Sequence, residues 1–266
     1  MNSHVRRFYR TFVDEETPVR FYHEVIALHE NPQLQWEDIQ QKMPSFPKGW
    51  HELAQLGLDD RLEFIQDFWL TTLPFVSHIH TFLNSFFNRL DDIGVYLTQS
   101  QFDSSFECEI VYSLRDDSSF FHGTPPSVEK IEVLKGDFND ELPEDYLSFL
   151  KIHDSFSKHS DTGIIRSKEM RSVYDKLQEK IQNEPIYSGK QLIDPKELIP
   201  FYESFGQPSF QCFYLGWTPM NSVGNVFYSM AEGRISDVHV QNSLTENLAF
   251  PSFLDWLIFY LEGIEN

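Results

Sequence analysis

Residue types that can perform chemistry are present, but few of them are spaced for it. His78 and His80 form an HxH pair, a spacing that two metal ligands can use. On a helix, residues two apart do not face each other, and no third or fourth ligand is marked nearby. Adjacent carboxylates occur at three expected turns or helix starts, namely Asp91-Asp92, Asp116-Asp117 and Glu144-Asp145. Acid–base work would need burial to shift their pKa values, so we expect solvated carboxylates and no bound metal.

Nucleophile and cofactor motifs are also missing. Cys108 and Cys212 lie in apolar, strand-like surroundings, where a buried free thiol is common. A single disulfide between them is the alternative. Neither cysteine has a histidine partner in a recognisable motif, and no serine lies in a nucleophile elbow. There is no P-loop and no dinucleotide glycine fingerprint. The sequence therefore predicts a protein that is not an enzyme, with no catalytic residue and no cofactor.

The charge of the chain excludes several classes of partner. The 266 residues carry 21 Lys and Arg against 41 Asp and Glu, a formal net charge of −20 that is spread evenly along the chain. Nucleic acids and anionic membranes require a basic patch, and none is visible. No stretch approaches 18 apolar residues, and the N-terminal arginines are followed by acids. We therefore expect no membrane span, no secretory signal and a cytoplasmic location.

Acidic residues in the last 70 positions suggest a protein partner. Residues 197–266 hold one basic residue, Arg234, against eight acids. One interpretation is a solvated acidic surface, and the other is a face that attracts a basic protein. Trp217 lies beside a predicted strand end, and tryptophan is enriched in binding hot spots. The candidate partner-binding residues are Trp217, Glu232, Asp237 and Glu246.

The elements that would position these residues fall into two predicted domains. Residues 1–126 are expected to be mainly helical with a few strands. Apolar residues at Leu58, Leu62, Ile65 and Trp69 predict one helix between Glu52 and Leu73, after which Pro74 should begin a new helix or kink this one. A second helix is predicted from the apolar stripe Val76, Ile79, Leu83, Phe86 and Leu90. This helix should end at Asp91, Asp92 and Gly94. Strands are predicted at 95–98 and 107–112, while residues 128–134 fit either a strand or a helix.

Residues 127–266 have the pattern of an α+β domain, an antiparallel sheet flanked by helices. Helices are predicted at 143–152, 168–182 and 252–262, with Ser167 and Ser252 as caps and Asp255 at the capping-box position. Strands at 210–215, 225–230 and 234–240 are separated by short turns. Links this short join antiparallel strands, so the block predicts a meander.

Four segments carry a resemblance to a known family, although no single motif among them is specific. They are Leu142-Pro143-Glu144-Asp145-Tyr146-Leu147-Ser148-Phe149-Leu150, Ser167-Lys168-Glu169-Met170, Gly224-Asn225-Val226-Phe227-Tyr228 and Phe250-Pro251-Ser252-Phe253-Leu254-Asp255-Trp256-Leu257. In their order and spacing, over about residues 127–266, they resemble the SUKH superfamily, which includes fungal cell-wall synthesis regulators and bacterial toxin-immunity proteins. The chain departs from the family at Asp154-Ser155-Phe156, where Asn-Gly-Gly is usual, and in a long connection before the meander.

The resemblance implies a non-catalytic protein-binding module, either a toxin-neutralising immunity protein or a regulatory scaffold. An acidic secretion-type chaperone is the alternative, and such a protein should be a dimer with exposed apolar grooves. The sequence does not define the partner's identity, the oligomeric state or the role of residues 1–126.

Overall fold

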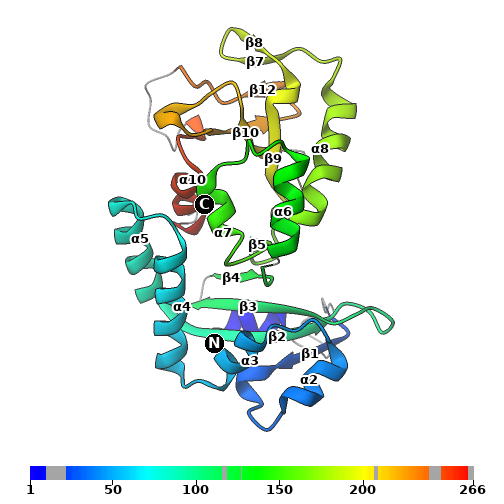
Figure 1. Ribbon diagram of the computed structural model, residues 1–266, viewed down its shortest axis with the longest axis vertical. Helices are drawn as coiled ribbons and strands as arrows, with labels where there is room; N and C mark the ends of the chain where they lie inside the picture. The colour runs from blue at the N-terminus through cyan, green and yellow to red at the C-terminus, as the bar shows by residue number, and fades with distance from the viewer. Residues whose placement is uncertain (10–21, 116–118, 127, 207–208, 240–246, 263–266) are drawn as a thin grey trace. The chain divides into compact units, whose positions relative to one another are not determined.

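The protein forms two compact units, and neither is one continuous stretch of chain. The structure is a computed structural model that describes residues 1–9, 22–115, 119–126, 128–206, 209–239 and 247–262 (Figure 1). Unit 1 comprises residues 1–71, 83–125 and 156–159, and unit 2 comprises residues 72–82, 126–155 and 160–266. Helices and largely antiparallel sheets give the α+β class that the sequence predicts. No helix in the described ranges is long and apolar enough to cross a membrane.

Unit 1 is built around a five-stranded antiparallel sheet, sheet A, in the order β1-β2-β3-β4-β5. The strands are β1 (Glu24–Ala27), β2 (Leu90–Gln99), β3 (Glu107–Leu114), β4 (Phe120–Gly123) and β5 (Phe156–Lys158). The helices are α1 (Ser3–Phe8), η1 (Leu28–Glu30), α2 (Trp36–Lys42), α3 (Lys48–Gln55), α4 (Leu58–Thr72) and α5 (Ser77–Asn88), whose residues from Leu83 onward lie in this unit.

Side chains alternate between the two faces of sheet A, and seven of the eight residues of β3 are buried, so both faces are covered at this strand. Val111 of β3 packs in a cluster with Val5 and Tyr9, at and just after α1. Tyr112, the next residue, accepts a hydrogen bond of 3.0 Å from the indole Nε1 of Trp69 in α4. Sheet A therefore separates α1 from α4.

Several predictions for the first half are confirmed, and others are wrong. Strands form at 95–98 and 107–112 as expected, and Ile79, Leu83 and Phe86 are buried in α5. The other two members of that stripe lie outside the helix, since Val76 precedes α5 and is exposed and buried Leu90 lies in β2. The helix predicted before Pro74 is two helices, because α3 ends at Gln55 and α4 begins at Leu58. Asp91, Asp92 and Gly94 do not end a helix in a turn. They lie inside β2, where pairing with β3 determines their conformation.

Unit 2 is built around a second sheet, sheet B, in the order β6-β9-β10-β11-β12-β7-β8, with β13 paired to β11. Its strands are β6 (Gly163–Ile164), β7 (Ile186–Ser188), β8 (Gln191–Ile193), β9 (Leu198–Glu203), β10 (Ser209–Tyr214), β11 (Asn225–Ser229), β12 (Arg234–Ile235) and β13 (Ala249–Phe250). The helices are α6 (Val128–Asp137), α7 (Glu144–Phe149), α8 (Ser167–Ile181), η2 (Pro195–Glu197), η3 (Pro219–Asn221) and α10 (Phe253–Glu262).

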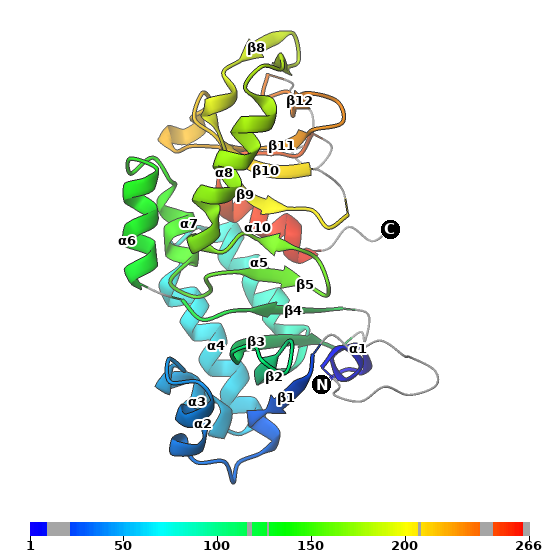
Figure 2. The ribbon, with the colours of Figure 1, turned by 90° about the vertical axis from the view of Figure 1, so that its right-hand side faces the viewer.

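Helices cover sheet B on both faces, as the alternating side chains of β10 show. Cys212 lies in a cluster with Leu177 and Ile181 of α8, whereas Phe213 contacts the ring of Tyr146 in α7 at 5.1 Å. Tyr146 in turn contacts Phe253 of α10. Figure 2 shows α8 lying across β9 and β10. All six residues of β10 are buried, so this strand forms the centre of the unit.

The predicted meander is confirmed, but sheet B as a whole is mixed. β10 and β11 pair antiparallel, and so do β11 and β12. β12 then pairs parallel with β7, a strand from the connection in which no strand was predicted. Because β12 ends at Ile235, it is also shorter than the predicted segment 234–240.

The predicted helices of unit 2 form with shifted ends and different caps. Ser252 caps α10 as expected: its hydroxyl accepts the Asp255 N–H at 3.1 Å and donates to the Asp255 carboxylate at 2.6 Å. Ser167 does not cap α8, since it is the first helical residue, and its N–H donates to buried Asp154 instead. Residues 128–134, which were ambiguous, lie in α6.

Candidate binding surface

The predicted contact residue Trp217 has a structural role. It is only partly exposed and packs against the core cluster of sheet B. Its N–H donates to Tyr214 O, and its carbonyl accepts from Gly224 N, both at 3.0 Å. A Cβ on Gly224 would lie 2.4 Å from Trp217 Cε3, so only glycine fits against this ring. Trp217 therefore fixes the turn between β10 and β11.

Glu232 and Asp237 lie before and after β12, the strand that pairs with β7 in sheet B, while Glu246 falls outside the described residues. Glu232 is exposed in the turn before β12, and Asp237 is half-buried just after it. The Asp237 carboxylate accepts the His239 N–H at 3.0 Å. It also lies so close to Gly189, in the β7–β8 turn, that a Cβ there would be 2.3 Å from Asp237 Oδ2. The structure therefore brings Asp237 against the β7–β8 hairpin.

The β7–β8 turn borders an open surface hollow. Its volume is about 560 Å³, and it is lined by Ser188, Gly189, Lys190, Gln191, Asp237 and His239. A ring nitrogen of His239 lies 3.2 Å from Gln191 Oε1. Lys190 and Asp237, which carry opposite charges, both line the hollow.

Two apolar side chains are exposed beside the hollow. Tyr187 of β7 and Leu192 of β8 are direct cross-strand partners, and they are 38% and 61% exposed. β8 is the last strand in the described order of sheet B, so its outer edge has no strand partner among those residues. An open edge of this kind can pair with an added strand. We call Tyr187, Leu192, Glu232 and Asp237, together with the edge of β8, the β8 edge surface.

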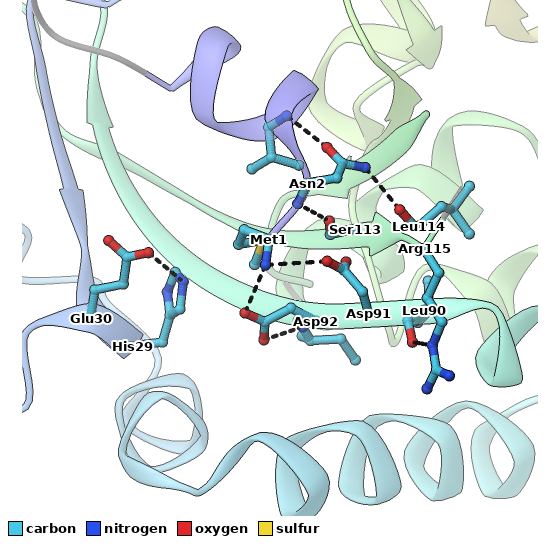
Figure 3. A network of polar contacts seen from close by, with 12 residues as sticks. Met1, Asn2, His29, Glu30, Leu90, Asp91, Asp92, Ser113, Leu114 and Arg115 are labelled. Carbon is cyan, nitrogen blue, oxygen red and sulfur yellow. Dashed lines mark hydrogen bonds and ion pairs between the residues drawn. The ribbon is translucent and has the colours of Figure 1, made fainter. Parts of the chain in front are cut away.

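Asp91 and Asp92 were predicted to be solvated carboxylates at a turn, and this prediction is wrong. The Met1 ammonium group lies 3.3 Å from Asp91 Oδ2 and 3.4 Å from Asp92 Oδ2 (Figure 3). Arg61 Nη2 donates to Asp92 Oδ1 at 2.9 Å, and the Arg61 side chain is 8% exposed. The two carboxylates are thus neutralised by buried cations, which gives them a structural role.

A second buried polar cluster in unit 1 was not predicted. Glu109 Oε2 accepts a hydrogen bond of 2.6 Å from the Tyr9 hydroxyl, and Glu109 Oε1 lies 3.4 Å from His122 Nδ1. His122 Nε2 lies 2.8 Å from the carbonyl of His159. Burial, with the nearby Glu109, raises the pKa of Tyr9 well above its usual value. The polar–apolar alternation around Glu109 was the sequence signal, because it placed that residue on one face of β3.

Aromatic rings pack closely around the Tyr9–Glu109–His122 cluster. The Tyr9 ring stacks on Tyr96 at 4.3 Å between centroids, and the ring of Phe120 lies 6.1 Å from that of His122. A carboxylate that is hydrogen-bonded and surrounded by rings in this way is held in one position, as in a buried network that stabilises the fold. We therefore assign the cluster to the packing of α1 on sheet A.

The remaining candidate acids and histidines do not converge on one site. His78 Nε2 contacts Asp255 Oδ1 at 2.9 Å, whereas His80 packs against the ring of Phe75. Asp145 accepts the Leu254 N–H at 3.0 Å, and burial raises the pKa of its carboxyl. Asp116 and Asp117 lie outside the described residues. Among those described, no three His, Cys, Asp or Glu side chains are grouped as metal ligands would be. The absence of metal and catalysis stays a prediction.

Both cysteines are free thiols rather than a disulfide. Cys108 lies in β3 of unit 1 and Cys212 in β10 of unit 2, and both are buried. Burial raises the pKa of each thiol far above its usual value. Since the thiolate is the nucleophilic form, neither sulfur is activated for chemistry.

Buried His29 should make unit 1 sensitive to acid. Its side chain is 2% exposed, and Nδ1 accepts the Val95 N–H, as in a neutral ring. Burial lowers the pKa of His29 more than nearby Asp92 raises it. The unfolded chain therefore binds more protons below about pH 6.5, and stability falls as the pH drops through that range.

We expect the urea midpoint of the wild type to fall between pH 7.5 and 5.5, and to fall less in His29→Gln. Burial also lowers the pKa of His159, so part of the dependence of the urea midpoint on pH should remain in His29→Gln. His239→Gln, a change at an exposed ring, is the matched control and should keep the wild-type slope. If the urea midpoint of His29→Gln fell with pH as steeply as that of the wild type, His29 would not be a cause of the acid sensitivity.

Comparison with known proteins gives no further guide to this surface. The chain matches no protein-family model, and no curated protein matches it.

Proposed function

We propose that the protein acts by binding another protein at the β8 edge surface, and that it does so in the cytoplasm without catalysis. The observation that carries this proposal is the cross-strand pair Tyr187 and Leu192, exposed beside an unpaired strand edge. An extended segment of the partner would add to β8 through its backbone, and the apolar pair would anchor its side chains. Tyrosine is one of the residue types enriched at binding hot spots, so Tyr187 is the expected centre of the binding energy.

Glu232 and Asp237 give this surface a role for charge. Neither pairs with a cation in the described part of the chain, although Lys190 and Arg234 lie on nearby turns and strands. The charge is therefore mixed at this end of sheet B. The apolar pair supplies affinity, and the two carboxylates steer a partner with basic residues toward the edge.

The resemblance to the SUKH superfamily supports the same class of function. The order α7, α8, the β10–β12 meander and α10 corresponds to the order on which that resemblance rests. Members that act as immunity proteins neutralise toxins by direct contact, and a regulatory scaffold would use contact in the same way. We propose unit 2 as the SUKH-like, partner-binding part of the chain.

The test is capture of partners from the source cell's lysate by the full chain, by two variants of the β8 edge surface and by two control variants. Tyr187→Ser with Leu192→Ser should reduce the captured partner about tenfold or more, because the anchors are lost. Glu232→Lys with Asp237→Lys should slow association and weaken its dependence on salt. The first control variant is Val133→Ser, which removes an exposed apolar side chain elsewhere. The second is Glu129→Lys with Glu179→Lys, which reverses two exposed charges elsewhere.

The controls should bind as the wild type does, and every variant should melt as the wild type does. Equal capture by the wild type and the Tyr187/Leu192 variant would exclude the β8 edge surface. A stable dimer in gel filtration that captures many unfolded clients would favour the chaperone alternative instead.

A further inference from the structure

Helix α4 exposes large apolar side chains beside the ones it buries. Its inner face is narrow, with Arg61, Ile65 and Trp69 buried at a spacing of four residues. Phe64 is 52% exposed and Phe68 is 36% exposed, although the helix lies in a unit with a well-buried core. Their rings stack with centroids 6.5 Å apart and planes 13° from parallel. The two rings form one continuous apolar strip along the helix.

A row of carboxylates runs beside this strip. Asp60, Glu63 and Asp67 are exposed and follow one another at spacings of three and four residues, so they share one side of the helix. Like charges at this spacing repel each other and cost about 0.2–0.5 kcal/mol per pair in an isolated helix. Asp60 also precedes Phe64 by four residues, so the acidic row and the aromatic strip are adjacent.

No cation on α4 compensates the row. Arg61 is the one basic residue of the helix, and it is buried and bonded to Asp92 and to the carbonyls of Leu56 and Ile93. In the described ranges, none of Asp60, Glu63 and Asp67 forms an ion pair. The outer face of α4 therefore combines exposed aromatic rings with uncompensated negative charge.

The other flank of α4 is occupied by the unit itself. Gln66 donates to Asn84 of α5 at 2.8 Å. Gln66 and Phe64 are two residues apart, about 200° around a helix, so α5 does not cover the aromatic strip. The strip and the acidic row are left for a partner, and we call Asp60, Glu63, Phe64, Asp67 and Phe68 the α4 outer face.

The charge of this face decides which partner fits. A second copy of the chain would bring the same carboxylates and a net charge of −20, so self-association here is repelled. Nucleic acid and anionic lipid are repelled for the same reason. A partner with Lys and Arg on one side and apolar residues on the other complements both the acidic row and the aromatic strip. Spacings of three and four residues along α4 match those along a second helix that packs beside it.

We propose that the α4 outer face docks a basic amphipathic helix of another protein. The apolar side of that helix packs on Phe64 and Phe68, and its basic side faces Asp60, Glu63 and Asp67. This surface lies in unit 1 and is independent of the β8 edge surface. The chain would thus have a second binding surface, in the region to which the family resemblance assigns no role.

The probe is a labelled synthetic helix of Leu and Lys, with Leu at spacings of three and four, titrated with the full chain by fluorescence anisotropy. We expect saturable binding that weakens as salt rises. Phe64→Ser with Phe68→Ser should weaken it at least tenfold. Asp60→Asn with Asp67→Asn should weaken it and reduce its salt dependence. The same helix with Glu in place of Lys should not bind.

Phe102→Ser is the matched control, because Phe102 is 75% exposed in the same unit. It should bind the probe as the wild type does, and so should Glu232→Lys with Asp237→Lys, which separates this surface from the β8 edge surface. All variants should melt as the wild type does. No binding of the Leu–Lys helix would overturn the proposal, and so would equal binding by the Phe64/Phe68 variant. Binding to phosphatidylserine vesicles that requires Phe64 and Phe68 would also overturn it, in favour of a membrane.

Discussion

Arg61→Met should lower the free energy of unfolding by about 3–5 kcal/mol, the cost of removing one partner from a buried ion pair. The guanidinium group donates to Asp92 at 2.9 Å, to Ile93 O at 2.9 Å and to Leu56 O at 2.7 Å. Methionine keeps most of the apolar stem, so the variant isolates the charge and its donors. After the change, the Met1 ammonium group is the remaining cation beside Asp92.

Urea unfolding at pH 7, followed by circular dichroism, measures this loss. Lys48→Met is the matched control, because Lys48 and Glu52 form an ion pair that is 73% and 66% exposed. An exposed pair at this spacing contributes only about 0.3–0.5 kcal/mol, so the control should stay close to the wild type. If both variants lost the same small amount, the Arg61 network would have no special role in unit 1.

Trp69→Ala should be comparably destabilising, at about 3–5 kcal/mol, the usual cost of deleting a large buried aromatic side chain. Trp69 is fully buried, and its ring makes edge contacts with Phe87, Tyr112 and Phe156 at 5.7–5.8 Å. One ring thus joins α4 and α5 to two strands of sheet A. Its deletion leaves a cavity among rings that cannot all move inward.

Trp69→Phe separates the hydrogen bond from the packing. It keeps an aromatic ring but leaves the Tyr112 hydroxyl without its indole donor, so we expect a loss of about 1–3 kcal/mol. Phe75→Ala, at a ring that is 78% exposed, should change stability by less than about 0.5 kcal/mol. The same urea transitions give all three values. A Trp69→Ala variant as stable as Phe75→Ala would contradict the described core of unit 1.

Local patterns in the sequence predicted the elements whose packing is local. Ile79, Leu83 and Phe86 of the predicted stripe form the buried face of α5, and Ser252 with Asp255 marks the start of α10 as predicted. Asp91 and Asp92 were misplaced because a turn signal is local, whereas their conformation depends on pairing with β3 and on the Met1 ammonium group. The parallel pairing of β12 with β7 joins strands that are far apart in sequence, and no short window contains it.

The candidate surfaces show the same limit. A shortage of Lys and Arg identified Glu232 and Asp237, but the three-residue strands that expose Tyr187 and Leu192 are too short to give a period. On α4, the predicted apolar stripe includes Leu58, which is 43% exposed. Periodicity identifies an apolar face, but it does not say that Phe64 and Phe68 remain outside while Arg61 is buried.

The position of β5 has a consequence for how the chain is made. β5 lies between α7 and α8 in sequence, yet it pairs with β4 at the edge of sheet A. A nascent chain that has released only β1 to β4 therefore presents an open edge on β4 until Phe156–Lys158 follow. Unpaired edges of this kind recruit other strands, so the edge of β4 is open to aggregation during the interval in which α6 and α7 emerge.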